Sequence, residues 1–236
     1  MKRAVIVGAV LAGGLSRRMG GQPKAMVELG GRPLVARVVA TVGSAGLEPI
    51  VVAKPDSVLP RLDCRVLSEP DEPRHPLTGL VAMLRASGGR SVVAIACDMP
   101  LVPAKLLTWI ANLEEEVAVC EVGGELEPLL GRYSPSVAGS LEAALERGAP
   151  MREAVAALNP FVISEQSLAR FADPRRIVFN INSPEDVSEA EDLLAGRTTR
   201  IRYRARRFTE RFVGDEGEAK RADAEPPAEA TPELRG

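Results

Sequence analysis

The chain of 236 residues carries 30 Lys plus Arg against 32 Asp plus Glu, a formal net charge of -2, which excludes a globally basic nucleic-acid binder. The length allows one or two domains. Hydrophobic residues make up 45% of the chain and aromatic residues only 3%, so the core must be mostly aliphatic, which favours layered helices and sheets. Cys64, Cys97 and Cys120 are odd in number and far apart. This spacing excludes a disulfide framework and a metal site and favours a reducing cytosol.

The first element is an apolar run over residues 4–11 that follows Lys2 and Arg3. It is too short to cross a bilayer and leads directly into a glycine-rich loop, so we expect neither a targeting nor a membrane segment. Continuous Val and Ile without polar alternation is typical of a strand covered on both faces, as in parallel sheets. A buried first strand is therefore predicted.

Helical and strand patterns alternate along the rest of the chain. In chain order we expect a helix over 33–45, a strand over 49–53, a helix over 77–86, a strand over 91–96, a helix over 103–113, strands over 117–122 and 128–134, a helix over 135–148, a strand over 177–181 and a helix over 183–194. This alternation predicts an α/β fold, a three-layer Rossmann-like arrangement whose mostly parallel sheet has helices on both faces. Ligands bind at the carboxyl ends of the strands in such sheets, so the loops after Leu11 and Ala96 are the candidate ligand-binding loops.

The composition changes after Ala195. Residues 196–236 hold 10 basic and 8 acidic side chains, which leaves 20 and 24 in the body of the chain. We therefore predict one domain over 1–195, an Arg-rich extension over 196–213 and a disordered tail over 214–236, rich in Glu, Ala and Pro.

The extension alternates arginines with Ile201, Tyr203 and Ala205, which is strand periodicity. Two interpretations stay open. One is a solvated charge run or an edge strand blunted by charge. The other is a docking surface for an acidic partner or an anionic substrate.

The loop after the first strand, residues 11–21, contains four glycines together with Arg17 and Arg18, and Lys24 follows at once. Glycine turns such as Gly13-Gly14 present backbone N–H groups to an anion, and the cationic side chains neutralise a triphosphate. The loop has neither the Gly-Lys-Ser/Thr of a Walker A motif nor the spacing of a dinucleotide fold. A tight turn with solvated arginines is the alternative.

Asp98 directly follows the expected strand over 91–96, in Cys97-Asp98-Met99-Pro100. A carboxylate at the carboxyl end of a strand is well placed to hold Mg²⁺ against phosphate oxygens. The alternative is an Asp that caps the helix expected after Pro103.

The two motifs together resemble a known family. Leu-Ala-Gly-Gly-x-Ser-x-Arg-Met-Gly-x-x-x-Lys over residues 11–24 and Cys-Asp-Met-Pro over 97–100 are similar to nucleotidyltransferases of the nucleotide-diphospho-sugar transferase fold. Pro76-Leu77-Thr78-Gly79 and Asn180-Ile181-Asn182-Ser183-Pro184-Glu185 narrow the resemblance to the molybdenum cofactor guanylyltransferases. It covers about residues 4 to 194.

The resemblance implies transfer of GMP from Mg·GTP to the terminal phosphate of molybdopterin or its molybdenum-loaded form, with release of pyrophosphate. Arg18, Lys24 and the Asp98-bound metal would offset the repulsion between an anionic nucleophile and the α-phosphate. A phosphate nucleophile is already ionised at neutral pH, so no acid or base is strictly required.

The resemblance also implies a set of binding residues. The backbone of Leu11, Ala12 and Gly13, with Gly14, would contact the nucleotide. An acidic nucleotide contact has two counterparts here, Glu69 by spacing from Val66 and Asp71 by residue type. Asn180 and Asn182 would bind the pterin or its phosphate, or would instead satisfy backbone groups before the last helix.

Several positions depart from the family pattern. Gln22-Pro23 stands before Lys24 where the family has Asp, His75 replaces a Gly, and Ala53 replaces an Asn. His75 is either a substrate contact or a surface residue. These departures weaken the prediction of guanine specificity more than that of nucleotidyl transfer.

The expected partners are GTP, molybdopterin and, beyond these, molybdoenzymes or cofactor-delivery proteins, with neither nucleic acid nor membrane, in the cytoplasm. The alternatives are a cytidylyl- or sugar/alditol-phosphate transferase of the same fold and a non-catalytic nucleotide-binding regulator.

Overall fold

The computed structural model describes residues 6–13 and 23–197. Gly14 and Arg18 lie outside these residues. So do the predicted tail and all of the Arg-rich extension after Arg197. The division into a domain over 1–195, an extension and a tail stays a prediction.

The central sheet is mixed and mostly parallel, as the alternating pattern predicts. In order across the sheet its seven strands are β5 (Arg65–Ser68), β4 (Glu48–Ala53), β1 (Val7–Leu11), β6 (Val92–Ala96), β8 (Glu125–Tyr133), β7 (Val117–Val122) and β9 (Phe161–Ile163). Only β8 runs against its two neighbours. A short antiparallel pair, β2 (Glu28–Leu29) and β3 (Arg32–Pro33), lies apart from this sheet.

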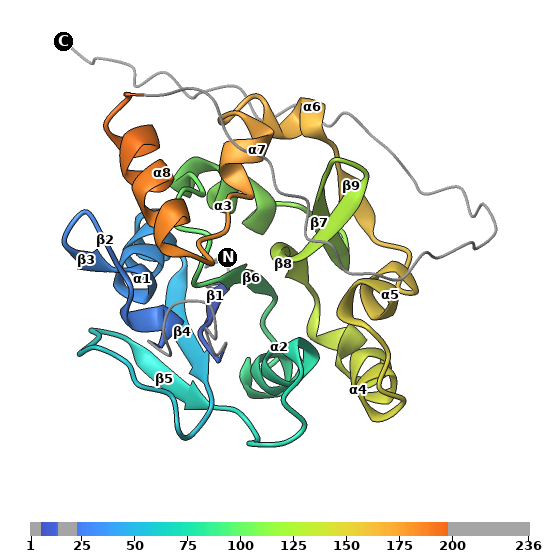
Figure 1. Ribbon diagram of the computed structural model, residues 1–236. Helices are drawn as coiled ribbons and strands as arrows, with labels where there is room; N and C mark the ends of the chain where they lie inside the picture. Colours follow the sequence, from blue (N-terminus) through green and yellow to red (C-terminus); the bar gives the residue numbers. More distant parts are fainter. Residues whose placement is uncertain (1–5, 14–22, 198–236) are drawn as a thin grey trace, which may run out of the picture.

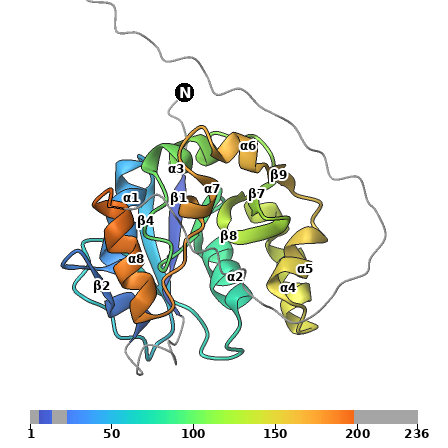
Figure 2. The same cartoon turned by 45° about the horizontal axis from the view of Figure 1, so that its top comes forward.

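Helices cover both faces of the sheet (Figures 1 and 2). One face packs against α1 (Leu34–Ser44), α3 (Ala104–Ala111), α6 (Glu165–Leu168) and α7 (Pro174–Ile177). The other packs against α2 (Pro76–Ala86), α4 (Ala138–Glu146) and α5 (Met151–Ala156). The last helix, α8 (Pro184–Leu194), packs beside β2 in a third apolar cluster. The three-layer α/β prediction is confirmed.

Strand β1 shows why its sequence is apolar throughout. Val7 and Ala9 point into the cluster with α2, whereas Val10 points into the cluster with α1, because successive side chains alternate between the faces of a sheet. Between them a Cβ at Gly8 would collide with Val42 of α1. The glycine thus lets the helix approach the strand closely.

Strand β1 lies between β4 and β6. The chain adds β4 and β5 on one side of β1 and then crosses to add β6 on the other side. The registers place Leu11 beside Val52 on one side and beside Ala96 on the other, so the three strands end together. Such a switch point opens a crevice at the carboxyl ends of the strands.

Most predicted elements are confirmed within a few residues, but the strand predicted over 177–181 is wrong. Ile177 ends α7, and Phe179 and Ile181 are buried in the third cluster, against α8 and Leu29. These apolar residues therefore pack beneath a helix and not in a sheet. The sheet ends on one side in β9, which the sequence pattern does not predict, and on the other side in β5. The helix predicted over 135–148 divides into the 3-10 turn η2 (Pro135–Val137) and α4.

Trp109 is buried on α3 and its ring lies 5.6 Å from that of Phe171, which supports a role in the core. Within the described part of the chain, no helix is long and apolar enough to cross a membrane.

Candidate active site

The carboxyl ends of four neighbouring strands bring their following residues to one edge of the sheet. Gly13 follows β1, Lys54 follows β4, Glu69 follows β5 and Asp98 follows β6. Backbone hydrogen bonds keep the strand ends aligned; for example, Ala12 N–H donates to the Val52 carbonyl at 2.8 Å. The edge thus gathers the charged side chains of Lys54, Glu69 and Asp98, which lie up to 44 residues apart in sequence.

Lys24 connects two parts of this edge. It opens the short 3-10 turn η1 (Lys24–Met26), and its ammonium donates to Asp98 Oδ2 and, over 2.7 Å, to Asn182 Oδ1. The Lys24 and Asp98 side chains are only 12% and 8% exposed. In a site so poorly hydrated, the charge of each group is felt strongly by its neighbour.

Asp98 does not cap the following helix. The N-cap residue of α3 is Pro103, and no side chain caps that helix. The Asp98 carbonyl instead accepts from Ile181 N–H at 3.0 Å, which ties the loop after β6 to the segment before α8. The alternative interpretation of the sequence, in which Asp98 caps the helix after Pro103, is therefore wrong.

The two asparagines before α8 have different surroundings. Asn182 reaches Lys24, whereas the Asn180 amide donates to the Val178 carbonyl at 2.9 Å. Ser183 caps α8 by accepting from Asp186 N–H, as predicted. The Asn182 side chain thus reaches the charged edge through Lys24.

Glu69 and Asp71 are also distinguished by their surroundings. Glu69 is 6% exposed and its carboxyl group lies between Gly13 and Gly79. Burial raises the pKa of Glu69 above its ordinary value, and the neighbouring Lys54 opposes this rise. The Asp71 side chain is 62% exposed and forms a 3.1 Å ion pair with Arg74.

A small cavity lies beside Lys24. Its lining residues are Ala12, Gly13, Pro23, Lys24, Ala25, Asp56, Ser57, Val58 and Arg74. Arg74 at its rim pairs with Asp56 at 2.8 Å, which lowers the pKa of that carboxyl group. The cavity therefore lies against the start of the glycine-rich loop, where the sequence predicts the nucleotide.

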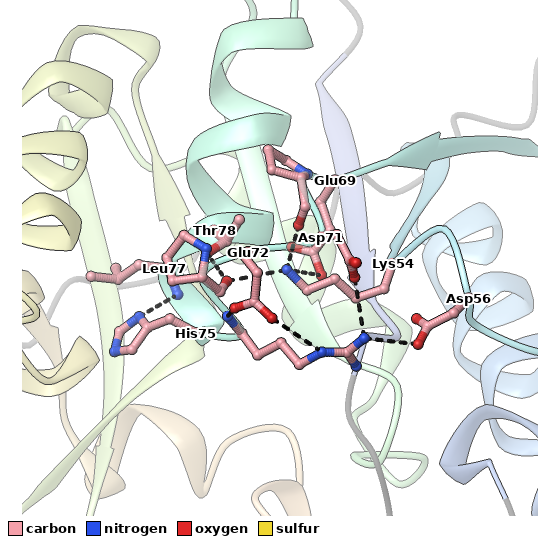
Figure 3. Close-up of polar contacts among 11 residues, drawn as sticks. Lys54, Asp56, Glu69, Asp71, Glu72, His75, Leu77 and Thr78 are labelled. Carbon is pink, nitrogen blue, oxygen red and sulfur yellow. Dashed lines mark hydrogen bonds and ion pairs between the residues drawn. The ribbon is translucent and has the colours of Figure 1, made fainter.

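His75 has a local role in the structure. Its Nδ1 accepts from Leu77 N–H at 3.2 Å and so caps the N-terminus of α2 (Figure 3). Burial lowers the pKa of His75, which favours the neutral ring that can accept this bond.

Lys54 belongs to the charged edge but is not among the predicted site residues. Its side chain is 4% exposed and its ammonium lies 3.7 Å from Glu69 Oε1. The signal that could have found it is a lysine placed directly after a buried strand, at the same strand end as Asp98.

The described residues contain no cluster of three or more metal-ligating His, Cys, Asp or Glu side chains. A cation at this edge would depend on Asp98 together with oxygen atoms of a bound ligand. Mg²⁺ commonly binds in this way, through one or two carboxylates plus substrate phosphates.

Comparison with known proteins identifies the family. The model of the MobA-like NTP transferase domain matches residues 8–161. This chain belongs to that family. It is a nucleotidyltransferase, as the sequence motifs predict.

Curated relatives and a solved structure agree with the family. A molybdenum cofactor guanylyltransferase of Cereibacter sphaeroides is 37% identical over 196 residues, covering 80% of this chain and 97% of the relative. A probable molybdenum cofactor guanylyltransferase of Pelotomaculum thermopropionicum is 31% identical, covering 82% and 96%. The crystal structure of molybdopterin-guanine dinucleotide biosynthesis protein A from Archaeoglobus fulgidus has a TM-score of 0.67 and 25% identity, covering 81% of this chain and all of its own.

Proposed function

We propose that this MobA-like enzyme transfers GMP from GTP to the terminal phosphate of molybdopterin or its molybdenum-loaded form. The names of the relatives above support the reaction. The observation that carries it is the contact of one partly buried lysine, Lys24, with both Asp98 and Asn182, because it joins the nucleotide side of the edge to the segment before α8.

In this reaction a phosphate oxygen of the acceptor attacks the α-phosphorus of GTP. A new P–O–P bond forms, the bond from the α-phosphorus to the bridging oxygen breaks, and its electron pair leaves with pyrophosphate. Both reactants are anions, so the enzyme's main task is to hold them together and neutralise their charge. We assign this task to Lys24 and, from the sequence, to Arg18 as a further cation.

We assign the nucleotide contacts to the start of the glycine-rich loop. The backbone of Leu11, Ala12 and Gly13, continuing into Gly14, would bind the nucleotide. Of the two acidic candidates we favour Glu69, because its buried carboxyl group lies against Gly13, whereas Asp71 is exposed and paired with Arg74. A carboxylate accepts both the N1–H and the amino group of guanine.

We assign the metal to Asp98 and expect Mg²⁺. The donor chemistry fits, because Asp98 is a buried oxygen donor that already has a cation, the Lys24 ammonium, beside it. When bound, Mg²⁺ would supply charge neutralisation at the phosphates. Asn182 would orient Lys24 and contact the acceptor phosphate, and Asn180 would hold the backbone of this segment in place.

We further propose that the enzyme works in the cytoplasm and passes its product to molybdoenzymes or cofactor-delivery proteins. The support for the compartment is that Cys64, Cys97 and Cys120 are free thiols, as is usual in a reducing environment.

The test is pyrophosphate release by the purified chain with Mg²⁺, molybdopterin and GTP, CTP or ATP in turn. We expect release with GTP that requires molybdopterin. Release with CTP but not with GTP would contradict the guanylyl assignment and favour a cytidylyltransferase. Nucleotide binding without turnover of any acceptor would favour a regulator.

A further inference from the structure

The site contains a second buried ion pair that the phosphate chemistry above does not use. Lys54 follows β4, Glu69 follows β5, and their side chains are 4% and 6% exposed. Removing two charges from water costs several kcal/mol per ion unless the geometry and the hydrogen bonds compensate. A pair so deeply buried beside a ligand site therefore calls for a functional reason.

The contacts of Lys54 attach it firmly to the turn that follows Glu69. Its ammonium donates to the Pro70 carbonyl and, over 3.2 Å, to the Pro73 carbonyl. The same Pro73 carbonyl accepts from Thr78 Oγ1 at 2.8 Å (Figure 3). Lys54 thus links the end of β4 to the turn after β5, and through that turn to the start of α2.

Glu69 is confined from two sides. A Cβ atom built on Gly79 would lie 2.6 Å from Glu69 Oε2, and one built on Gly13 would collide with Oε1. Both neighbours must therefore be glycines for the carboxyl group to occupy this position. The two oxygens lie between the start of the glycine-rich loop and α2, and the Lys54 ammonium approaches from a third direction.

We propose that Lys54 is a positioning residue that orients the Glu69 carboxylate toward the nucleotide base and thereby sets the preference for guanine. The inference rests on the proposed function, in which Glu69 contacts the base. Lys54 itself is not placed to bind phosphate, because its ammonium is buried and already donates to two carbonyls.

The chemistry of the bases explains why the charge on Glu69 matters. Guanine presents two adjacent donors, N1–H and the amino group, which suit the two acceptors of an ionised carboxylate. Cytosine and adenine present one donor beside one acceptor, which suits a protonated carboxyl group. An ionised and oriented Glu69 therefore favours guanine.

Lys54 opposes the effect of burial on this carboxyl group. Burial raises the pKa of Glu69, and the charge of Lys54 lowers it. Without Lys54 the population of the protonated, neutral Glu69 carboxyl group increases. The turn that follows Glu69 also loses the two hydrogen bonds that Lys54 donates. Both changes weaken a contact that guanine needs more than other bases do.

The test compares Lys54→Met, Lys54→Arg and Arg90→Met with the wild-type chain, measuring kcat and KM for GTP, for ITP, which lacks the amino group, and for CTP. For Lys54→Met we expect the KM for GTP to rise about 10- to 100-fold, the size of a lost charge-assisted hydrogen bond, with kcat changing much less. The preference for GTP over ITP should largely vanish. Lys54→Arg, which keeps the charge, should recover part of this preference.

Arg90→Met is the matched control. It removes the ion pair of Arg90 with Glu48 at the other end of β4, so it should change neither KM nor base preference. If Lys54→Met lowers kcat/KM for GTP and ITP by the same factor, Lys54 is merely structural and the inference is wrong.

The double variant Lys54→Met/Glu69→Gln supplies a second readout and removes both buried charges, so it also serves if the single variant does not fold. If Lys54 acts through Glu69, the double variant binds GTP no more weakly than Glu69→Gln alone. Additive losses would overturn the inference. A wild-type chain that does not prefer GTP would overturn the proposed function, whereas a GTP preference that survives in Lys54→Met would overturn only the role of Lys54.

Discussion

Two ion pairs at the carboxyl edge of the sheet, Lys24 with Asp98 and Lys54 with Glu69, are largely shielded from water, whereas the pair of Arg90 with Glu48 at its amino edge is more exposed. The side chains of Lys24, Asp98, Lys54 and Glu69 are 4% to 12% exposed, but those of Arg90 and Glu48 are 29% and 42% exposed. The two edges belong to the same strands, so strand composition does not explain the difference.

The difference between the two edges shows where this fold keeps buried ion pairs despite their energetic cost. Exposed pairs contribute about 0 to 1 kcal/mol, and screening by water makes them tolerant of change. Buried pairs are costly to form and costly to break on one side. The carboxyl edge, where ligands bind in such sheets, is the edge that retains them.

The largest expected effect is at Lys24 and Asp98, the pair that we propose acts on the phosphates. Asp98→Asn and Lys24→Met should each lower turnover about 10²- to 10³-fold, because each removes a charge that the transition state needs in a poorly hydrated site. Pyrophosphate release measures the loss, and circular dichroism checks that the fold persists. Turnover within fivefold of wild type for either variant would remove that residue from the proposed machinery.

A smaller effect is expected at the glycines that confine Glu69. Gly79→Ala places a methyl group 2.6 Å from Glu69 Oε2, so we expect a loss of about 1 to 3 kcal/mol in the free energy of unfolding and a raised KM for GTP.

Gly139→Ala is the matched control for Gly79→Ala, because both glycines lie in helices but a Cβ added at Gly139 in α4 meets no atom of any other described element within 4 Å. It should change the free energy of unfolding by no more than about 1 kcal/mol, in the stabilising direction. Denaturant titration measures both variants. Equal stability of the two would show that Glu69 moves aside at little cost.

Substitution at the amino edge should have little effect on the free energy of unfolding. Arg90→Met should cost at most about 1 kcal/mol in the free energy of unfolding, and the wild-type pair should contribute less as salt is added, because exposed pairs are screened. Thermal unfolding in low and high salt measures this. A loss as large as that of Gly79→Ala would mean that exposure does not separate the two edges.

The smallest effect concerns cysteine labelling. Burial raises the pKa of Cys97, beside Asp98, to about 12, whereas Cys64 is only half-buried. At pH 8 iodoacetamide should therefore modify Cys64 first in the native chain, with Cys97 reacting only after unfolding. Mass spectrometry of the modified peptides gives the order, and early labelling of Cys97 would show that the carboxyl edge opens.

The sequence pattern predicts the elements that surround the site because their signals are local. Ser183-Pro184 at the start of α8 and the apolar run before Asp98 both mark real boundaries. The segment over 177–181 misleads because its apolar residues are buried by residues far away in the chain, such as Leu29 and Leu101 around Phe179 and Ile181. A short apolar run predicts that a segment is buried, but it does not predict which other elements bury it.

The sequence by itself determined the family, the α/β alternation and the residue types of the proposed phosphate site, because glycine loops, caps and buried strands are encoded in consecutive residues. Only the tertiary structure decided that Glu69 is buried at the site while Asp71 is exposed, and that Lys54 stands beside Glu69. The physical reason is that burial depends on which distant residues surround a side chain, here Gly13 after β1 and Gly79 in α2.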